Sequence, residues 1–137
     1  MKVYQDEFEI RTSKRTELID ITSKVEDIVR KSKIKNGICN VFVPHATAAV
    51  ILNENESGLV DDIVDKIEKE FPAGAGYRHD RIDDNADSHL ASGFIGQSKV
   101  IPLNDNKLLR GTWQQIFALE LDGPRSGRKV IVTIIGE

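Results

Sequence analysis

The chain has 137 residues, and its 22 acidic and 19 basic side chains give a formal net charge of -3. This length fits one domain, predicted to span residues 1–137, and a hydrophobic fraction of 39% excludes wholesale disorder. The acidic balance argues against a general nucleic-acid-binding protein, and no apolar run approaches the roughly 20 residues of a membrane span. One cysteine excludes an internal disulfide, and the N-terminal segment lacks the apolar run of a signal peptide. We therefore expect a compact cytoplasmic protein.

The first half of the chain predicts four strands, with one helix between the second and the third. The strand segments are residues 3–10, 17–21, 38–43 and 48–52. A polar turn separates the first two segments, so we expect them to pair as a hairpin. Thr22 or Ser23 is the expected N-cap of the helix, and Asn36-Gly37 is its expected end. The last segment is apolar throughout, which leaves a helix there as the alternative.

The second half contains the clearest helix, residues 55–70, in which apolar residues recur at every fourth position, Leu59, Ile63 and Ile67, a spacing that Phe71 continues just beyond it. The polar segment after it, residues 77–88, has no apolar periodicity, and irregular stretches of this length in small domains usually have a function. A short helix and three strands complete the chain: residues 89–95, 99–103, 115–121 and 129–135. Because strands and helices do not alternate regularly, the expected fold class is α+β, with antiparallel or mixed sheets and two to three helices.

All three histidines lie at loops or element boundaries. His45 follows the end of a predicted strand, His79 lies in the polar segment, and His89 opens the short helix. Imidazole is a common metal ligand and the usual proton-transfer group near neutral pH. The spacings match no short metal motif, so two interpretations stay open: shared ligation of one ion, or three separate hydrogen-bonding histidines. Carboxylates near His79 would either orient a metal-bound ring or keep the loop soluble.

Two further polar groups are candidates for a binding site. Asn53 and Glu54 lie between a predicted strand and the clearest helix, where they would line a site, although capping of that helix by Asn55 or Ser57 explains the cluster equally well. Arg125 lies in a loop rich in Gly and Pro, and its guanidinium would hold a phosphate or stay solvated.

The single tryptophan and the single cysteine have structural interpretations. Trp113 indicates packing in the core or at an interface. Cys39 shares a strand face with Val41 and Val43, so we expect a small core residue rather than a nucleophile.

Several segments in this order resemble the YjbQ-like family, also named secondary thiamine-phosphate synthases. The similarity covers most of the chain, and Gly-Thr-Trp-Gln after a His-Leu segment is its most specific part. The matching segments are Pro44–Ala48, Asn53-Glu54, Arg78-His79, Asn85, Ser88–Leu90, Ser98–Pro102, Gly111–Ile116 and Gly123–Arg125.

The resemblance implies a β-sandwich-like core, a homotrimer, and a polar site in which His45, His79 and His89 hold a metal ion. It also implies that other polar residues line this site: Thr47, Asn53, Glu54, Asn85, Thr112 and Arg125. The implied activity is weak thiamine-phosphate synthesis, which joins a pyrimidine pyrophosphate to a thiazole phosphate with loss of pyrophosphate.

Three functional hypotheses follow. In the first, the protein is an enzyme: the three imidazoles hold a zinc-like divalent ion, His45 and Glu54 are catalytic with Glu54 as general base, and Arg125 anchors an anion. Departure of pyrophosphate usually calls for Mg²⁺, which prefers oxygen ligands, so either a second ion binds carboxylates or the synthase activity is incidental. In the second, the pocket binds a small phosphorylated or anionic ligand without turnover. The third is a purely structural trimer.

Overall fold

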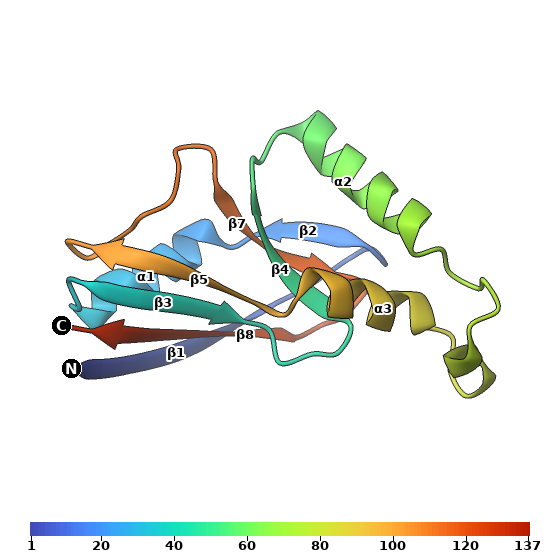
Figure 1. The fold of residues 1–137 in the computed structure, drawn as a ribbon, viewed down its shortest axis with the longest axis horizontal. Helices are drawn as coiled ribbons and strands as arrows, with labels where there is room; N and C mark the ends of the chain where they lie inside the picture. The colour runs from blue at the N-terminus through green and yellow to red at the C-terminus, as the bar shows by residue number, and fades with distance from the viewer.

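The computed structural model describes residues 1–137 and contains two antiparallel sheets (Figure 1). Five strands form the larger sheet, in the order β1 (Lys2–Ile10), β8 (Arg128–Gly136), β3 (Gly37–Phe42), β5 (Ser98–Asn104) and β6 (Lys107–Leu108). The smaller sheet has three strands, in the order β2 (Glu17–Asp20), β7 (Gln115–Glu120) and β4 (Ala48–Asn53). Helix α1 (Thr22–Ser32) packs against both, so the predicted α+β class with sandwich-like sheets is confirmed.

The predicted hairpin of the first two strands is wrong. β1 pairs with the C-terminal strand β8 over its whole length, from Lys2 opposite Gly136 to Ile10 opposite Arg128. β2 pairs with β7 in the other sheet. A nine-residue partner lets every residue of β1 join a ladder, which a four-residue β2 does not offer.

Helix α1 buries Val25, Ile28 and Val29, which are the apolar face that its sequence contains. Its start differs from the prediction, because Thr22 lies inside the helix and no side chain caps its N-terminus. The Thr22 hydroxyl instead accepts a hydrogen bond from Ile116 N at 2.8 Å, which ties the helix to β7. The helix ends earlier than predicted, at Lys33 in the left-handed conformation with φ of 59°.

Helix α2 (Ser57–Glu70) is the predicted amphipathic helix, and Figure 1 shows it standing away from the sheets. Its N-cap is neither Asn55 nor Ser57. The side chain of Glu56 accepts hydrogen bonds from Gly58 N at 2.7 Å and Leu59 N at 2.9 Å. No residue of α2 is fully buried, so much of its apolar face stays accessible in the single chain.

The polar segment contains a short 3-10 helix, η1 (Arg78–Arg81), and leads into α3 (Ala86–Ile95). Helix α3 therefore begins three residues before the predicted start at residue 89. It packs on β4 through a small apolar cluster: Ala49, Ala91, Leu119 and Leu121. None of the helices has the length and apolar character needed to cross a membrane.

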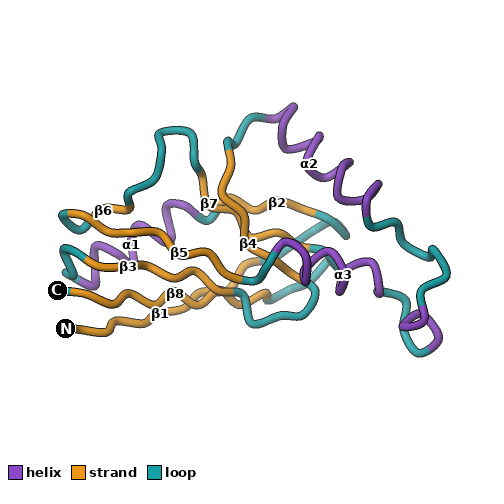
Figure 2. Tube along the Cα trace, in the orientation of Figure 1, coloured by secondary structure: helices purple, strands orange, loops and turns teal.

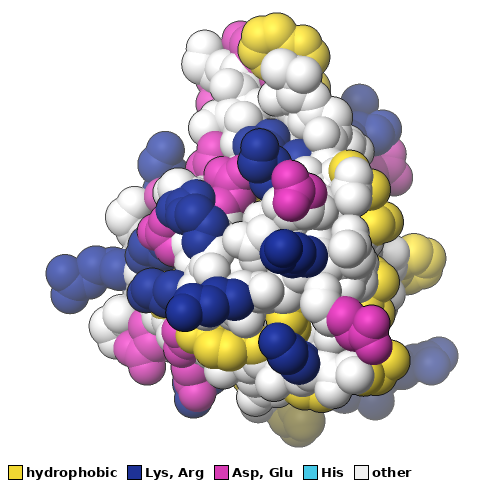
Figure 3. All heavy atoms as spheres, turned by 90° about the vertical axis from the view of Figure 1, so that its left-hand side faces the viewer, with side chains coloured by type: hydrophobic (Ala, Val, Ile, Leu, Met, Phe, Trp, Pro, Cys, Tyr) yellow, Lys and Arg dark blue, Asp and Glu magenta, His cyan; other side chains and the backbone are white.

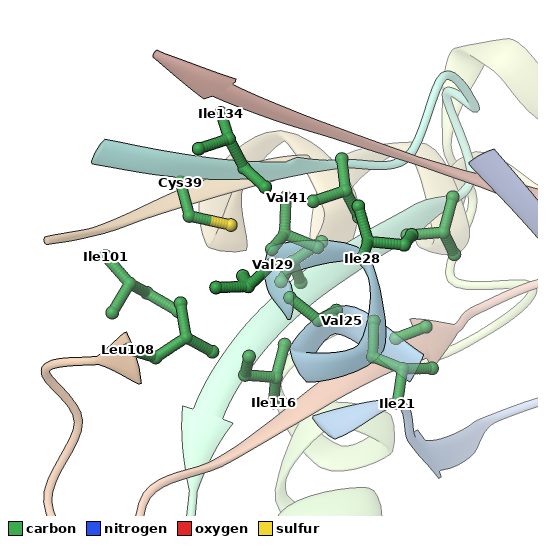
Figure 4. Packing of buried hydrophobic residues seen from close by; sticks show 14 of the residues in the cluster. Ile21, Val25, Ile28, Val29, Cys39, Val41, Ile101, Leu108, Ile116 and Ile134 are labelled. Carbon is green, nitrogen blue, oxygen red and sulfur yellow. The ribbon is translucent and has the colours of Figure 1, made fainter. Parts of the chain in front are cut away.

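The main core lies between the two sheets (Figure 4). It contains 19 buried residues drawn from both sheets and from α1, and this shared core makes the chain one domain. Cys39 is 0% exposed, as predicted, and burial raises the pKa of its thiol to about 12. The thiol is therefore protonated and unreactive at neutral pH.

The two ends of the molecule differ in character. At the end shown at the left of Figure 1, both termini meet, and the Met1 amino group lies 3.4 Å from a Glu137 carboxylate oxygen. Figure 3 views this end and shows lysine, arginine and acidic side chains but no histidine. The loops before β4, between α2 and α3, and between β7 and β8 lie toward the other end (Figure 2).

Candidate functional site

The loops at that end bring six of the predicted site residues into one neighbourhood. They are His45, Thr47, His79, Asn85, His89 and Arg125. Thr47 O accepts a hydrogen bond from Leu121 N at 3.2 Å, which joins the loop before β4 to the loop after β7. Asp122, the next residue, joins the second loop to Asn85 at the start of α3. Residues far apart in the sequence therefore meet here.

His79 and His89 are in direct contact. Their ring centroids are 4.8 Å apart, and the rings meet edge to face with an interplanar angle of 68°. A cavity of about 550 Å³ opens beside them. Its lining is mainly apolar apart from the two rings and one arginine: Gly76, Tyr77, Arg78, His79, Ala86, His89 and Leu90. The cavity has room for a small molecule with an apolar part.

A relay of hydrogen bonds selects the tautomer of the neutral His79 ring. Asn85 Nδ2 donates to Asp122 Oδ2 at 2.8 Å, so Asn85 Oδ1 is the atom that faces His79 Nε2, at 3.2 Å. An amide oxygen only accepts hydrogen bonds, so neutral His79 carries its proton on Nε2 and leaves the Nδ1 lone pair free. An oxygen acceptor that holds the second ring N–H, here an amide oxygen fixed in turn by a carboxylate, is typical of metal-ligating histidines.

Asp122 is the centre of the polar contacts, and the sequence prediction missed it. Its Oδ2 also accepts from Arg125 Nη2 at 3.0 Å, and its Oδ1 lies 3.7 Å from Arg15 Nη1. Arg15 in turn lies 2.9 Å from Asp87. The only sequence signal was the position of Asp122, directly between a buried strand and the Gly-Pro-Arg segment.

His45 is oriented differently from His79. Its Nε2 accepts a hydrogen bond from Lys129 N at 2.8 Å, so the proton of the neutral ring is on Nδ1. Burial lowers the pKa of His45 below the ordinary value of 6.5, and the positive charge of Arg128 lowers it further. The ring is therefore neutral at pH 7 and offers an N–H group rather than a lone pair.

Thr47 is held in place by an ion pair that the sequence did not reveal. Arg128 Nη2 donates to Thr47 O at 3.1 Å and to its Oγ1 at 2.9 Å. Thr47 is only 7% exposed, so its hydroxyl serves the structure rather than a ligand. Arg128 itself is paired with Glu120, and the side chains of the two are 7% and 0% exposed.

The other three predicted residues lie at the opposite end of the smaller sheet. Asn53 is the last residue of β4 and pairs with Gln115, whereas Thr47 precedes the first residue of that strand. A strand of six residues spans roughly 20 Å. Glu54 follows Asn53, and Thr112 lies in the loop before β7, at a cavity of about 530 Å³ beside α1. One chain therefore does not bring Asn53, Glu54 and Thr112 to the histidines.

Comparison with known proteins identifies the family. The sequence pattern described as "UPF0047 protein YjbQ-like" matches residues 6–137. The chain belongs to the UPF0047 (YjbQ-like) family. It is 48% identical to a UPF0047 protein of Methanothermobacter thermautotrophicus over 137 residues, which cover 100% of this chain and 95% of that protein. It is 32% identical to the UPF0047 protein YugU of Bacillus subtilis, over 86% of this chain and 89% of that protein.

Solved UPF0047 structures share the fold. A YbjQ-like protein of Sulfolobus solfataricus superimposes with a TM-score of 0.98 at 51% identity, over 99% of each chain. A YjbQ/UPF0047 protein of Clostridium acetobutylicum, an orthologue of YugU, gives a TM-score of 0.90 at 37% identity, over 95% of this chain and 99% of that chain. The resemblance inferred from the sequence motifs is thereby confirmed.

The UPF0047 site fits a metal ion only in part. No group of three or more His, Cys, Asp or Glu side chains in the chain is arranged to hold one ion. His79 offers a free Nδ1, and His89 makes no hydrogen bond through its ring, so these two imidazoles suit a zinc-like metal. The Nε2 lone pair of His45 is occupied by the hydrogen bond from Lys129 N, so the neutral His45 ring has no lone pair left for the same ion. The chain alone does not assemble the predicted set of three histidine ligands.

Trp113 does not lie in the core of the UPF0047 chain. It is 70% exposed at the tip of the loop before β7, and Leu109 in the same loop is 57% exposed. Two large exposed apolar side chains in one loop are typical of an interaction surface. Of the two predicted roles for Trp113, the structure excludes core packing.

Proposed function

We propose that this UPF0047 protein is a cytoplasmic homotrimeric enzyme that binds a zinc-like divalent ion and a small phosphorylated or anionic substrate. The observation that carries the proposal is the relay from Asp122 through Asn85 to His79, which leaves the Nδ1 lone pair free on a ring that is in contact with His89. Asn85 is buried although His79 itself is exposed, so the relay orders a surface imidazole from a fixed side chain beneath it.

His79 and His89 are the ligands that this chain would supply to the metal. When bound, a zinc-like ion would act as a Lewis acid and lower the pKa of a coordinated water. Mg²⁺ is the alternative ion, but its preference for oxygen ligands fits two imidazoles poorly. Remaining coordination positions are open to water, substrate or a carboxylate from a second copy.

The anionic part of the substrate would bind at Arg125 and His45. Arg125 donates to Asp122 through Nε and Nη2, and its side chain is 48% exposed, so Nη1 remains free for a phosphate oxygen. His45 adds a neutral Nδ1–H donor nearby. Leu90 and Tyr77, in the cavity beside His79, would contact an apolar or aromatic part of the substrate.

A second copy of the chain would complete the site. Glu54 is the proposed general base, yet it follows Asn53 at the far end of β4 from His45, the end at which the Thr112 loop enters β7. A homotrimer brings the far end of one chain to the histidines of the next. The exposed Trp113, in the same loop as Thr112, supports an interface at that end.

The reaction class within this proposal is weak thiamine-phosphate synthesis. A pyrimidine pyrophosphate has the apolar ring and the anionic tail that the cavity and Arg125 would accommodate. Loss of pyrophosphate requires neutralisation of its charge, which the metal and Arg125 would supply. The zinc-like character of the two-histidine site favours an incidental activity on this substrate pair over a dedicated one.

Mixed trimers of two inactive variants test the enzyme and its shared site together. His79→Ala and Glu54→Ala homotrimers should each lose thiamine-phosphate synthesis. After unfolding and joint refolding, about one quarter of the wild-type rate should return, because that fraction of randomly mixed interfaces pairs an intact His79 with an intact Glu54. Unchanged rates in both single variants would refute the enzyme, and absence of recovery would refute the shared site. Zinc content, measured on the same samples, should fall in His79→Ala.

A non-catalytic binding module is the second candidate function. It is favoured by one observation: within the chain, the carboxylate of Glu54 lies far from His79, and no nucleophile contacts a base. If the protein is such a module, pyrophosphate should raise its melting temperature, but no phosphorylated substrate should be turned over.

A further inference from the structure

A buried ion pair lies behind the candidate site and is hydrogen-bonded to the loops before β4 and after β7, although it does not line the cavity. Arg128 Nε lies 3.0 Å from both carboxylate oxygens of Glu120. Arg128 begins β8 and Glu120 ends β7, so the pair bridges the two sheets at the edge where the site loops emerge. Neither side chain is accessible to a ligand, since they are 7% and 0% exposed.

On its first side, the pair fixes the turn that carries His45. Arg128 Nη2 bonds to the carbonyl and the hydroxyl of Thr47, which follows His45 by two residues. The backbone N–H of Lys129, next to Arg128, then holds the His45 ring through Nε2. The position of β8 therefore sets both the turn and the orientation of the imidazole.

On its other side, the pair fixes the relay to His79 and the position of Arg125. Glu120 Oε2 accepts from Asp122 N at 3.1 Å, which holds the residue that orients Asn85. Thr12 Oγ1 donates to Glu120 Oε1 at 2.7 Å and accepts from Arg125 N at 2.8 Å. The Glu120 carboxylate thus holds Asp122 directly and Arg125 through Thr12.

Stability alone does not explain such a pair. Desolvation offsets most of the attraction between two buried charges, and apolar residues of similar volume often serve as well or better. The pair is hydrogen-bonded to three residues, Thr47, Thr12 and Asp122, and apolar side chains would not make these bonds. An orienting role therefore accounts for the pair better than a stabilising one.

We propose that Glu120 and Arg128 are positioning residues that hold His45 as a neutral imidazole, with its Nδ1–H presented to an anionic oxygen of the ligand beside Arg125. His45 Nδ1 has no partner within the chain, and no buried side-chain nitrogen lacks one, so Nδ1 reaches solvent. In this tautomer His45 has no free lone pair for a metal. His45 therefore donates a hydrogen bond to the anionic ligand, whereas His79 would bind the metal ion. The binding of an anionic ligand at His45 rests on the proposed function, whereas the orientation of the His45 ring does not.

Nitrogen-15 spectra of the histidine rings test the orientation without any ligand. In the wild-type protein at neutral pH, His45 should show the Nδ1–H tautomer and His79 the Nε2–H tautomer. The Glu120→Leu/Arg128→Met double variant removes both charges together, and in it His45 should show a mixture of tautomers. The matched control is Asp27→Leu/Arg30→Met, which removes an exposed ion pair of α1 and should leave both rings unchanged. An Nε2–H tautomer for His45 in the wild type, or an unchanged His45 in the folded double variant, would overturn the proposal.

Two substitutions of His45 test its role as a donor, and they remain informative if the double variant does not fold. Asn carries an N–H close to the position of Nδ1, whereas Gln places its amide near Nε2. Pyrophosphate affinity, measured by calorimetry, should stay within a few-fold of wild type in His45→Asn and fall by about tenfold or more in His45→Gln, which loses a hydrogen bond to a charged group. Equal losses in both variants would refute the donor role. Wild-type tautomers with no turnover would refute the enzyme while leaving the positioning role intact.

Discussion

His79 Nε2 lies 3.2 Å from Asn85 Oδ1, and this contact decides which nitrogen of His79 is free. His45 has the opposite arrangement, because Lys129 N donates to its Nε2 at 2.8 Å. In its neutral form the His79 ring therefore offers a free Nδ1 lone pair, whereas His45 offers an N–H group. In the proposed function, the lone pair would bind the metal ion and the N–H group an anionic oxygen of the ligand.

Loss of Asn85 should weaken metal binding. Asn85→Ala removes the link between Asp122 and His79, so both His79 tautomers become populated and the ring is free to rotate. Removal of a residue that orients a metal ligand typically lowers metal affinity by about 10- to 100-fold. A competition assay with a zinc chelator measures the change, and Asn104→Ala, an exposed change in β5, is the control. Equal zinc affinity in both variants would contradict the relay.

The acid stability of the protein should depend on Glu120. Burial alone would raise the pKa of Glu120, but hydrogen bonds from Arg128, Thr12 and Asp122 N outweigh it and hold the pKa below the ordinary value of 4.5. The stabilisation is therefore complete above pH 4.5 and is lost as the pH falls through the lower pKa of the folded state. Urea unfolding should show a smaller loss of free energy on acidification in Glu120→Leu/Arg128→Met than in wild type. The same loss in both proteins would show that Glu120 carries no linked stabilisation.

Trp113 is the only tryptophan, so its fluorescence reports directly on whether this loop is buried between copies of the chain. It is 70% exposed in the single chain, so a buried indole in solution would have to be covered by another copy. Emission of the wild-type protein should be that of a buried indole at high concentration and shift to the red on dilution. Trp113→Ala should weaken assembly by roughly tenfold or more, as for tryptophans central to an interface. Sedimentation velocity measures that loss, and the emission of a hydrated indole at every concentration would exclude Trp113 from the interface.

The local patterns of the sequence predicted most strands and helices correctly, because alternation and four-residue spacing follow from the geometry of each element. The pairing of β1 was beyond those patterns. Its partner is β8, at the other end of the chain, and apolar alternation does not encode which of several similar strands lies beside it. The cap of α2 was also missed, since Glu56 is a weaker N-cap type than its neighbours Asn55 and Ser57.

The candidate site was predictable in its residue types but not in its arrangement. Histidines at element boundaries and an arginine beside Gly and Pro carry a chemical signal of their own. Asp122, Glu120 and Arg128 do not, because charged side chains are usually solvated and only the fold shows that Glu120 and Arg128 are buried. The separation of Glu54 from His45 likewise depends on the direction of β4, which the sequence pattern leaves open.

Gly123 should prove essential for the geometry of the Asp122 loop. A Cβ atom at Gly123 would lie 2.1 Å from Lys14 O and 2.8 Å from Glu120 Cγ, so Gly123→Ala must displace the backbone beside Asp122. We expect a loss of roughly 1–3 kcal/mol in the free energy of unfolding, the usual cost of overpacking, and a matching loss of zinc affinity. The control is Gly93→Ala in α3, where a Cβ would meet nothing within 4 Å. This substitution should raise the free energy of unfolding by about 1 kcal/mol at most, because alanine favours a helix more than glycine does. Thermal melts and zinc titrations of the two variants separate the cases, and a Gly123→Ala protein as stable and as well metallated as Gly93→Ala would show that the loop tolerates movement.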